Sequence, residues 1–334
     1  MIRLALAALF GLLLLPLPVA GAKPAPLKVA VVDLRVHLPY QLVSKGRAMA
    51  LGSGQADLAR MRHGGVYGVV LPLLGGLRSE PRAERLLPVY LSVQRALNRT
   101  PELRLPGCRR AGSGFRTWLA IEGAGELAGA PTSAGLWVTR GVRLFGLVRT
   151  EDDDLATSAS TPEPVLTGLS AKGRTLVHAI HQAGGVVDVS HASAMTVRDV
   201  VEIARADGVP VVASHSNARA VTDHPRNLSD EEIVSIAGTG GVIGISFVPS
   251  MLARGRRPDL NDVVRHVRHV VRVAGVDHVA IGSGFEGGIW PPHELINASR
   301  YPRLWAALTD AGMSASAIRK IASDNALRVL CPAK

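Results

Sequence analysis

Two short stretches decide the fold of this chain: residues 185–191 read GVVDVSH, and residues 210–216 read PVVASHS. Each is an apolar, β-branched run typical of a buried strand, and each ends in hydroxyl and imidazole side chains. Similar runs recur along the chain, and amphipathic stretches separate most of them. The eight runs that we predict as strands are Lys28–Asp33, Gly65–Leu73, Phe115–Glu122, Val142–Val148, Gly185–Ser190, Pro210–Ser214, Gly241–Phe247 and His278–Gly282.

Helical patterns lie between these strands. The stretch Leu169–Ala183 has Ser170 as its predicted N-cap, and Ser314–Leu330 is predicted as a further helix. The stretch Asp259–Ala274 places five valines on one face and the basic residues Arg265, His266, Arg268, His269 and Arg272 on the other. We interpret that basic face as the solvated outside of a barrel helix. Eight strand–helix units predict an α/β fold, a (β/α)8 TIM-like barrel. The alternative is an open doubly wound sheet, but no G-x-G-x-x-G follows a strand.

Composition bounds the class of protein. The chain has 334 residues, of which 47% are apolar and 4% aromatic. This composition excludes a disordered chain, and the scarcity of aromatic residues weighs against a protein that stacks nucleic-acid bases. The net charge is +11, and 32 of the 38 basic residues are Arg. Because these residues are scattered, we interpret the charge as a compositional bias and predict no nucleic-acid partner.

The first 22 residues resemble a secretory signal. Arg3 precedes an apolar run from Leu4 to Val19, and Ala20-Gly21-Ala22 forms a small-residue cleavage site. The run is short for a membrane-spanning helix. We therefore predict a signal peptide over 1–22, an exported (periplasmic or extracellular) protein cleaved near Ala22, and a single barrel domain over 23–334. No transmembrane segment is expected in the mature chain. Cys108 and Cys331 could pair in an oxidising compartment, and the sequence alone leaves this open.

Polar residues follow the predicted strands. In a parallel barrel the carboxyl ends of all strands meet at one rim, where active sites sit. Glu122, His191 and His215 end three different strands and are therefore expected to converge. Two imidazoles and a carboxylate suit zinc or a similar divalent ion. The polar stretch 149–168 is predicted to form a long loop at the same rim. Arg226 follows the sixth strand and could bind a carboxylate, although a surface turn begun by Pro225 is an equal alternative. His178 and His181 are expected to form an exposed pair on their helix.

Several of these segments together resemble the membrane (renal) dipeptidases, a family of zinc peptidases. The resemblance covers roughly residues 28–330. Its most specific parts run from Gly168 to His191 and from Ser214 to Asn227; Ile121-Glu122-Gly123 and the stretch from Tyr301 to Leu330 add to it. The family implies a two-zinc dipeptide hydrolase that tolerates D-residues and is often dimeric. It further implies that Glu122 bridges the metals, that His191 and His215 are ligands of one metal, and that Arg226 binds the substrate carboxylate.

The chain departs from the family at four positions. The His-x-Asp pair that holds the other metal is replaced by Arg35 and His37. Arg149 stands where the family has a His near the oxyanion, and Gly284 stands where it has the proton-handling Asp. Arg cannot serve as a metal ligand, because it stays protonated. Arg35 is therefore expected to replace one metal ion electrostatically, leaving one zinc ion.

Three weaker site residues follow from the same comparison. His37 is a weak candidate metal ligand and Arg149 a weak candidate for substrate binding. Glu286, two residues beyond Gly284, is a weak candidate to replace the lost catalytic acid. The sequence thus predicts either an exported dipeptidase-like metallohydrolase with weakened or altered activity, or a catalytically inactive homologue that binds a peptide or a partner. Efficient dipeptide hydrolysis is not expected.

Overall fold

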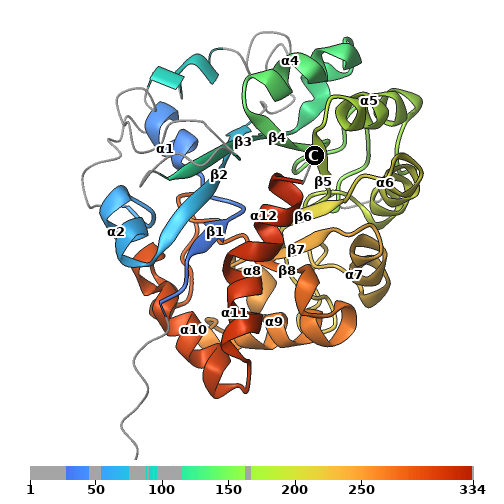
Figure 1. The fold of residues 1–334 in the computed structure, drawn as a ribbon. Helices are drawn as coiled ribbons and strands as arrows, with labels where there is room; N and C mark the ends of the chain where they lie inside the picture. Colours follow the sequence, from blue (N-terminus) through green and yellow to red (C-terminus); the bar gives the residue numbers. More distant parts are fainter. Residues whose placement is uncertain are drawn as a thin grey trace, which may run out of the picture.

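The computed structural model describes residues 28–44, 54–74, 115–161 and 167–332, together with 88, 90–92, 94, 95 and 108. The predicted leader, residues 1–22, lies outside the described residues. Eight parallel strands pair in chain order and close into a barrel, β1 to β8 (Figure 1). They are β1 Val31–Asp33, β2 Val66–Leu74, β3 Arg116–Glu122, β4 Val142–Gly146, β5 Val186–Asp188, β6 Val212–Ser216, β7 Val242–Ile245 and β8 Val279–Ile281. The predicted (β/α)8 barrel is confirmed, and each strand overlaps its predicted range.

Helices surround the strands. They are α1 Leu38–Ser44, α2 Leu58–His63, α4 Ala134–Thr139, α5 Ala171–Gln182, α6 Ala194–Asp207, α7 Asp230–Ala237, α8 Pro249–Leu252, α9 Leu260–Ala274, α10 Tyr301–Asp310, α11 Ala315–Arg319 and α12 Asn325–Leu330. A π-helical turn, Lys320–Asp324, joins α11 to α12, so the predicted helix Ser314–Leu330 is present with one widened turn. In the described part of the chain, no helix combines the length and the apolar character needed to cross a bilayer.

The predicted helix starts are confirmed by their caps. The Ser170 side chain accepts a hydrogen bond from the Gly173 amide at the start of α5. Asp259 caps α9 reciprocally with Asp262, in a capping box that satisfies two amides that the helix leaves unpaired. These contacts fix where two of the predicted helices begin.

Two histidine predictions were wrong. His266 was placed on the solvated face of α9, but it is fully buried, and its Nδ1 atom accepts from the Ala218 amide at 3.2 Å. His181 was predicted to be exposed with His178. It is buried instead, because α5 packs beside α6 and Asp207 at the end of α6 bonds the Nδ1 atoms of both histidines. Both side chains pack between secondary-structure elements, and neither lies on the protein surface.

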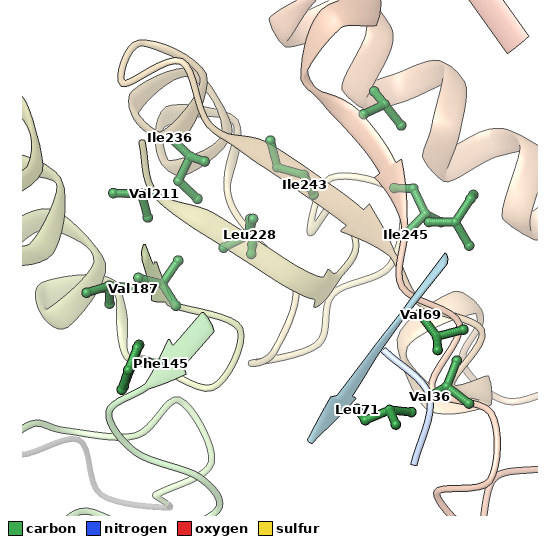
Figure 2. Close-up of a cluster of buried hydrophobic side chains, with 14 of the residues drawn as sticks. Val36, Val69, Leu71, Phe145, Val187, Val211, Leu228, Ile236, Ile243 and Ile245 are labelled. Carbon is green, nitrogen blue, oxygen red and sulfur yellow. The ribbon is translucent and has the colours of Figure 1, made fainter. Parts of the chain in front are cut away.

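The core has two layers, separated by the strands. Outward-facing strand residues such as Val69, Phe145, Val187 and Ile243 pack against the helices (Figure 2). Inward-facing residues, among them Val32, Trp118 and Val212, pack against one another and against Ala326, Val329 and Leu330 of α12. Helix α12 lies in front of the strands, near the centre of their ring, in Figure 1. It therefore closes the amino-terminal end of the barrel, which leaves the carboxyl end for a site.

A disulfide joins Cys108 to Cys331, immediately after α12. The two residues are separated by 223 positions in the sequence, and their Cα atoms lie 5.4 Å apart. The sequence left this pairing open, because it could not show whether the two cysteines approach each other. The bond anchors the helix that closes the barrel to the segment between β2 and β3.

Candidate metal and anion site

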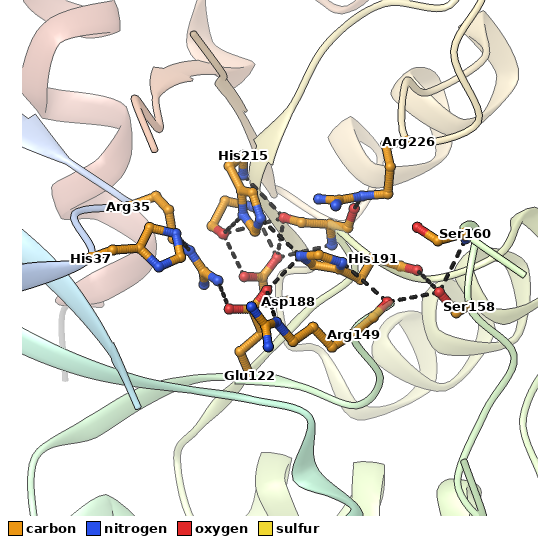
Figure 3. Close-up of polar contacts among 12 residues, drawn as sticks. Arg35, His37, Glu122, Arg149, Ser158, Ser160, Asp188, His191, His215 and Arg226 are labelled. Atoms are coloured by element: carbon orange, nitrogen blue, oxygen red, sulfur yellow. Dashed lines mark hydrogen bonds and ion pairs between the residues drawn. The ribbon is translucent and has the colours of Figure 1, made fainter. Parts of the chain in front are cut away.

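Three buried side chains meet at the carboxyl rim. Glu122 ends β3, His191 follows β5 by three residues, and His215 lies in β6 (Figure 3). The His191 Nε2 atom lies 2.5 Å from Glu122 Oε1 and 3.1 Å from His215 Nε2. Each residue offers one ligand atom, and these atoms all lie within 4.8 Å of one another. The convergence predicted from the strand ends is therefore present in the structure.

An irregularity in β6 aims His215 into this group. Ala213 pairs with Ile243 and Ser216 with Ile245, so three steps along β6 face two steps along β7. Such a bulge bends a strand and redirects the side chains within it. The sequence prediction ended this strand at Ser214, whereas the observed strand continues to Ser216 and carries His215 within it.

Hydrogen bonds fix the protonation of both imidazoles. The Nδ1 atom of His191 contacts the carbonyl oxygen of Arg149 at 3.1 Å; a carbonyl can only accept, so this nitrogen donates. The Nδ1 atom of His215 lies 2.8 Å from the Ser214 hydroxyl, which itself donates to Asp188. Since the single hydroxyl proton goes to the carboxylate, His215 Nδ1 donates as well. Each Nε2 atom is then left with a lone pair, and that of His191 faces the Glu122 carboxylate.

Burial keeps both rings neutral. It is the largest cause that holds the pKa of His191 and of His215 well below the usual value, and the nearby Arg35 and Arg226 guanidinium groups add to it. Two imidazole lone pairs and a carboxylate oxygen thus crowd together without a proton to separate them. This donor set fits a divalent cation, and the three residues could hold one metal ion.

Arg35 occupies the other side of the carboxylate. Its Nη2 atom donates to Glu122 Oε2, and its Nε atom donates to His37 Nε2 at 3.1 Å. Burial lowers the pKa of Arg35 to about 9, with the Asp188 carboxylate opposing the shift, so the group stays cationic at neutral pH. The structure does not bring His37 into the three-residue group, because its Nε2 lone pair accepts from Arg35.

Two further guanidinium groups point toward the centre (Figure 3). Arg226 donates from Nε to the Ser190 carbonyl at 2.7 Å, and its buried Nη2 atom has no hydrogen-bond partner among the described residues. Arg149 lies in the predicted loop after β4; its Nε atom is 3.8 Å from Glu122 Oε1, and its side chain is 33% exposed. The Arg226 side chain therefore reaches the rim and does not lie in a surface turn, which was the alternative interpretation.

Gly284 and Glu286 follow β8 in left-handed backbone conformations, with φ of +78° and +66°. Glycine adopts such angles readily, but glutamate does so rarely. The turn directs the Glu286 carboxylate to the Ala56 amide, which donates to its Oε1 atom at 2.8 Å. Among the described residues, Glu286 is not part of the group formed by Glu122, His191 and His215.

Asp188 and Asp33 have structural roles at this rim that were not predicted from the sequence. Asp188 Oδ1 accepts from the amides of Ser190 and Ser214, and its two oxygens accept from both serine hydroxyls. It therefore ties β5 to β6 beneath the two imidazoles. An aspartate two residues before a hydroxyl residue at a strand end, as in Asp188-Val189-Ser190, is the signal that could have indicated this role.

Asp33 plays the corresponding part on the opposite strands. Its Oδ1 atom accepts from the amides of Arg35 and Ser283, and its Oδ2 atom accepts from the hydroxyls of Ser283 and Tyr301. The carboxylate thereby links β1 to β8 and α10. This network fixes the backbone from which Arg35 extends.

Comparisons with known proteins agree with this arrangement. The profile of the membrane dipeptidase family, peptidase family M19, matches residues 22–334. An uncharacterized dipeptidase of Schizosaccharomyces pombe is 32% identical over 213 residues, which are 63% of this chain and 51% of the relative. The match thus spans about half of that relative's length.

Solved structures extend the comparison to the fold. A dipeptidase of family M19 is 26% identical, with a TM-score of 0.79, over 91% of this chain and 98% of its own. A metallopeptidase from Rhodobacter sphaeroides, liganded with a phosphinate mimic of L-Ala-D-Ala, is 25% identical with a TM-score of 0.78, over 91% of this chain and 99% of its own.

Proposed function

Since the chain belongs to the membrane dipeptidase family, we propose that it is an exported, dipeptidase-like metallohydrolase with one zinc ion and weakened or altered activity. One observation carries this proposal. Glu122 Oε1 contacts His191, whose Nε2 atom in turn lies 3.1 Å from that of His215, while Arg35 takes Oε2. The same carboxylate that would bridge two metals thus has a guanidinium on one side.

Glu122, His191 and His215 would hold the zinc ion, and we assign no ligand role to His37. A zinc ion held there would supply Lewis acidity to an amide carbonyl and to a water molecule. The chain's own residues would do the remaining work. Arg226 would bind the substrate carboxylate with its Nη2 atom, which has no hydrogen-bond partner among the described residues, and Arg149 would contact the substrate from another side of the site.

Weakened turnover follows from the missing acid. Gly284 has no side chain to carry a proton, and the Glu286 carboxylate is engaged by the Ala56 amide. Loss of one general acid or base typically costs about 10²–10⁴-fold in rate. The alternative function is a catalytically inactive homologue that binds a peptide or a partner. The substitutions at Arg35 and Gly284 favour it, because together they remove a metal position and the proton carrier.

Export is supported by two features. The first 22 residues have the charge, the apolar run and the cleavage site of a signal peptide. The disulfide between Cys108 and Cys331 is a bond that persists in oxidising compartments. Detection of mature protein beginning at Lys23 outside the cytoplasm would test this part of the proposal.

The metal count and the activity need separate measurements. Protein loaded with zinc and passed through a gel-filtration column should contain one zinc ion per chain by elemental analysis, and the column also reports the oligomeric state. Two tightly held ions in the wild-type protein would contradict the single-zinc proposal. The double variant Arg35→His with His37→Asp should bind a second ion, because it replaces the guanidinium with two ligands.

The activity assay compares the wild-type protein with the triple variant Arg35→His, His37→Asp, Gly284→Asp, using L-Ala-D-Ala as substrate. We expect hydrolysis by the triple variant to be about 10²–10⁴-fold faster. Wild-type hydrolysis as fast as that of the variant would refute weakened activity. Wild-type protein that binds the dipeptide without any turnover, beside an active triple variant, would support the inactive alternative.

A further inference from the structure

The centre of the site carries more positive than negative charge. Arg35, Arg149 and Arg226 point toward it from different elements, whereas the carboxylates among the residues of Figure 3 are Glu122 and Asp188. His191 and His215 are neutral there. These groups leave one uncompensated positive charge, and a divalent ion would raise the excess to three. Buried charge without a partner is costly, so this excess indicates that the ligand itself is anionic.

The two carboxylates are already engaged elsewhere. Glu122 meets Arg35 and His191, and Asp188 accepts from Ser190, which follows β5, and from Ser214 of β6. Arg149 forms a long ion pair with Glu122, 3.8 Å from Nε to Oε1, which is too far for a hydrogen bond, and Glu122 already pairs with Arg35. Arg226 donates to a main-chain carbonyl, and its Nη2 atom is unpartnered among the described residues. Arg226 is therefore buried with a donor that the described residues leave unused, and Arg149 shares its carboxylate partner with Arg35, so both arginines can take an anionic ligand.

The residues that carry these two guanidinium groups are both anchored beside His191. The Arg149 carbonyl is held by the His191 ring and by the Ser158 hydroxyl, and the Arg226 side chain is held by the Ser190 carbonyl. Both arginines are thus anchored to consecutive residues, and they reach the centre from the β4–α5 and β6–α7 connections. A ligand that spans the metal-binding group can contact Arg226 at one end and Arg149 at the other.

We propose that the substrate is an amide flanked by two carboxylates, such as an N-acyl amino acid whose acyl chain also ends in a carboxylate. This inference rests on the proposed function for the position of the scissile amide. The carboxylate on the amine side binds Arg226, and the carboxylate on the acyl side binds Arg149. An ordinary dipeptide carries an ammonium group on its acyl side, which Arg149 repels. Hydrolysis adds water across the C–N bond and yields a dicarboxylate and an amino acid.

Calorimetric titration of the zinc-loaded protein with three matched ligands tests the inference through binding affinity rather than through the rate of hydrolysis. N-succinylglycine carries both carboxylates, N-butyrylglycine replaces the acyl-side carboxylate with a methyl group, and glycylglycine carries an ammonium. We expect N-succinylglycine to bind about tenfold or more tightly than N-butyrylglycine, because a hydrogen-bonded ion pair is gained. Glycylglycine should bind weakest. Equal affinities for the first two ligands would overturn the inference.

Variants show whether Arg149 causes the preference. Arg149→Gln should remove the difference between N-succinylglycine and N-butyrylglycine, and Arg149→Lys should retain part of it. The control, Arg268→Gln, removes one positive charge from the exposed face of α9 and should leave the ratio unchanged. A preference that survives Arg149→Gln would contradict the assignment. The ratio of the two affinities can be measured even if the protein hydrolyses nothing. Failure of the inference and failure of the proposed activity are therefore distinguishable. Thermal unfolding verifies that each variant folds.

Discussion

The Arg35 guanidinium donates to the Oε2 atom of Glu122, and both side chains are almost completely buried, at 1% and 4% exposure. A buried pair of this kind is not in itself a strong source of stability, but breaking it is expensive because one charge is left without a partner.

Glu122→Gln should destabilise the fold and remove the metal. The substitution leaves the Arg35 charge buried without its counter-ion, so we expect a loss of about 3–5 kcal/mol in the free energy of unfolding. Urea denaturation of the metal-free protein measures this loss apart from zinc binding. Glu202→Gln, on the exposed face of α6, is the matched control and should change stability by less than about 0.5 kcal/mol. Equal stability of the two variants would show that the buried charge of Arg35 does not need Glu122 as its counter-ion.

Ser214→Ala should weaken zinc binding without removing a ligand. The Ser214 hydroxyl donates to Asp188 and accepts from His215 Nδ1. It therefore holds the His215 ring in the orientation that presents Nε2 to the metal. Loss of such a supporting contact typically lowers metal affinity about 10–100-fold. Competition with a zinc chelator measures the change. Ser216→Ala is the control on the same strand, because the Ser216 hydroxyl is buried without a hydrogen-bond partner in the described structure. A similar loss of zinc affinity in both variants would contradict this role of the Ser214 hydroxyl.

Asp33 should make stability depend on pH. Burial raises the pKa of Asp33 to about 6, against 3.8 ordinarily, although four hydrogen bonds oppose the shift. A folded-state pKa above the unfolded value gives stability that is present below about pH 4 and is lost as the pH rises through 6. The loss should reach about 3 kcal/mol. Unfolding of wild-type and Asp33→Asn proteins across pH 3–8 measures the difference between them, which should change between pH 4 and 6. A constant difference would refute an elevated pKa.

Reduction of the disulfide should destabilise the barrel. The bond closes a loop of 223 residues, and loss of a native disulfide typically costs about 2–5 kcal/mol. We expect Cys331→Ser to unfold at lower urea concentration than the oxidised wild-type protein and at the same concentration as the reduced one. A wild-type midpoint that does not respond to reductant would indicate that the bond contributes little.

Much of the fold could be predicted because its signals are local. Short β-branched runs marked all eight strands, and Ser170 and Asp259 marked helix starts that the structure confirms. The convergence of Glu122, His191 and His215 followed from topology alone, since every strand of a parallel barrel ends at the same rim. Locating the strands in the sequence was therefore enough to predict that three residues distant in the sequence lie close together.

What could not be predicted depends on contacts between side chains and on backbone angles. The pairing of Arg35 with both Glu122 and His37 removes His37 from the metal group, and only the folded geometry shows it. The direction of Glu286 depends on a left-handed turn that its residue type does not favour. The burial of His181 and His266 depends on which neighbouring helices cover them. Helical periodicity alone could not reveal those partners.

The last helix has a consequence for how this molecule is made. Helix α12 supplies the base against which the inner strand residues pack, and its final residues are cross-linked to position 108. A ribosome delivers this segment after all eight strands, so the inner layer cannot be completed during synthesis of the earlier ones. Folding of the barrel therefore ends with this segment, because neither the inner layer nor the covalent link to position 108 can form before the segment is available.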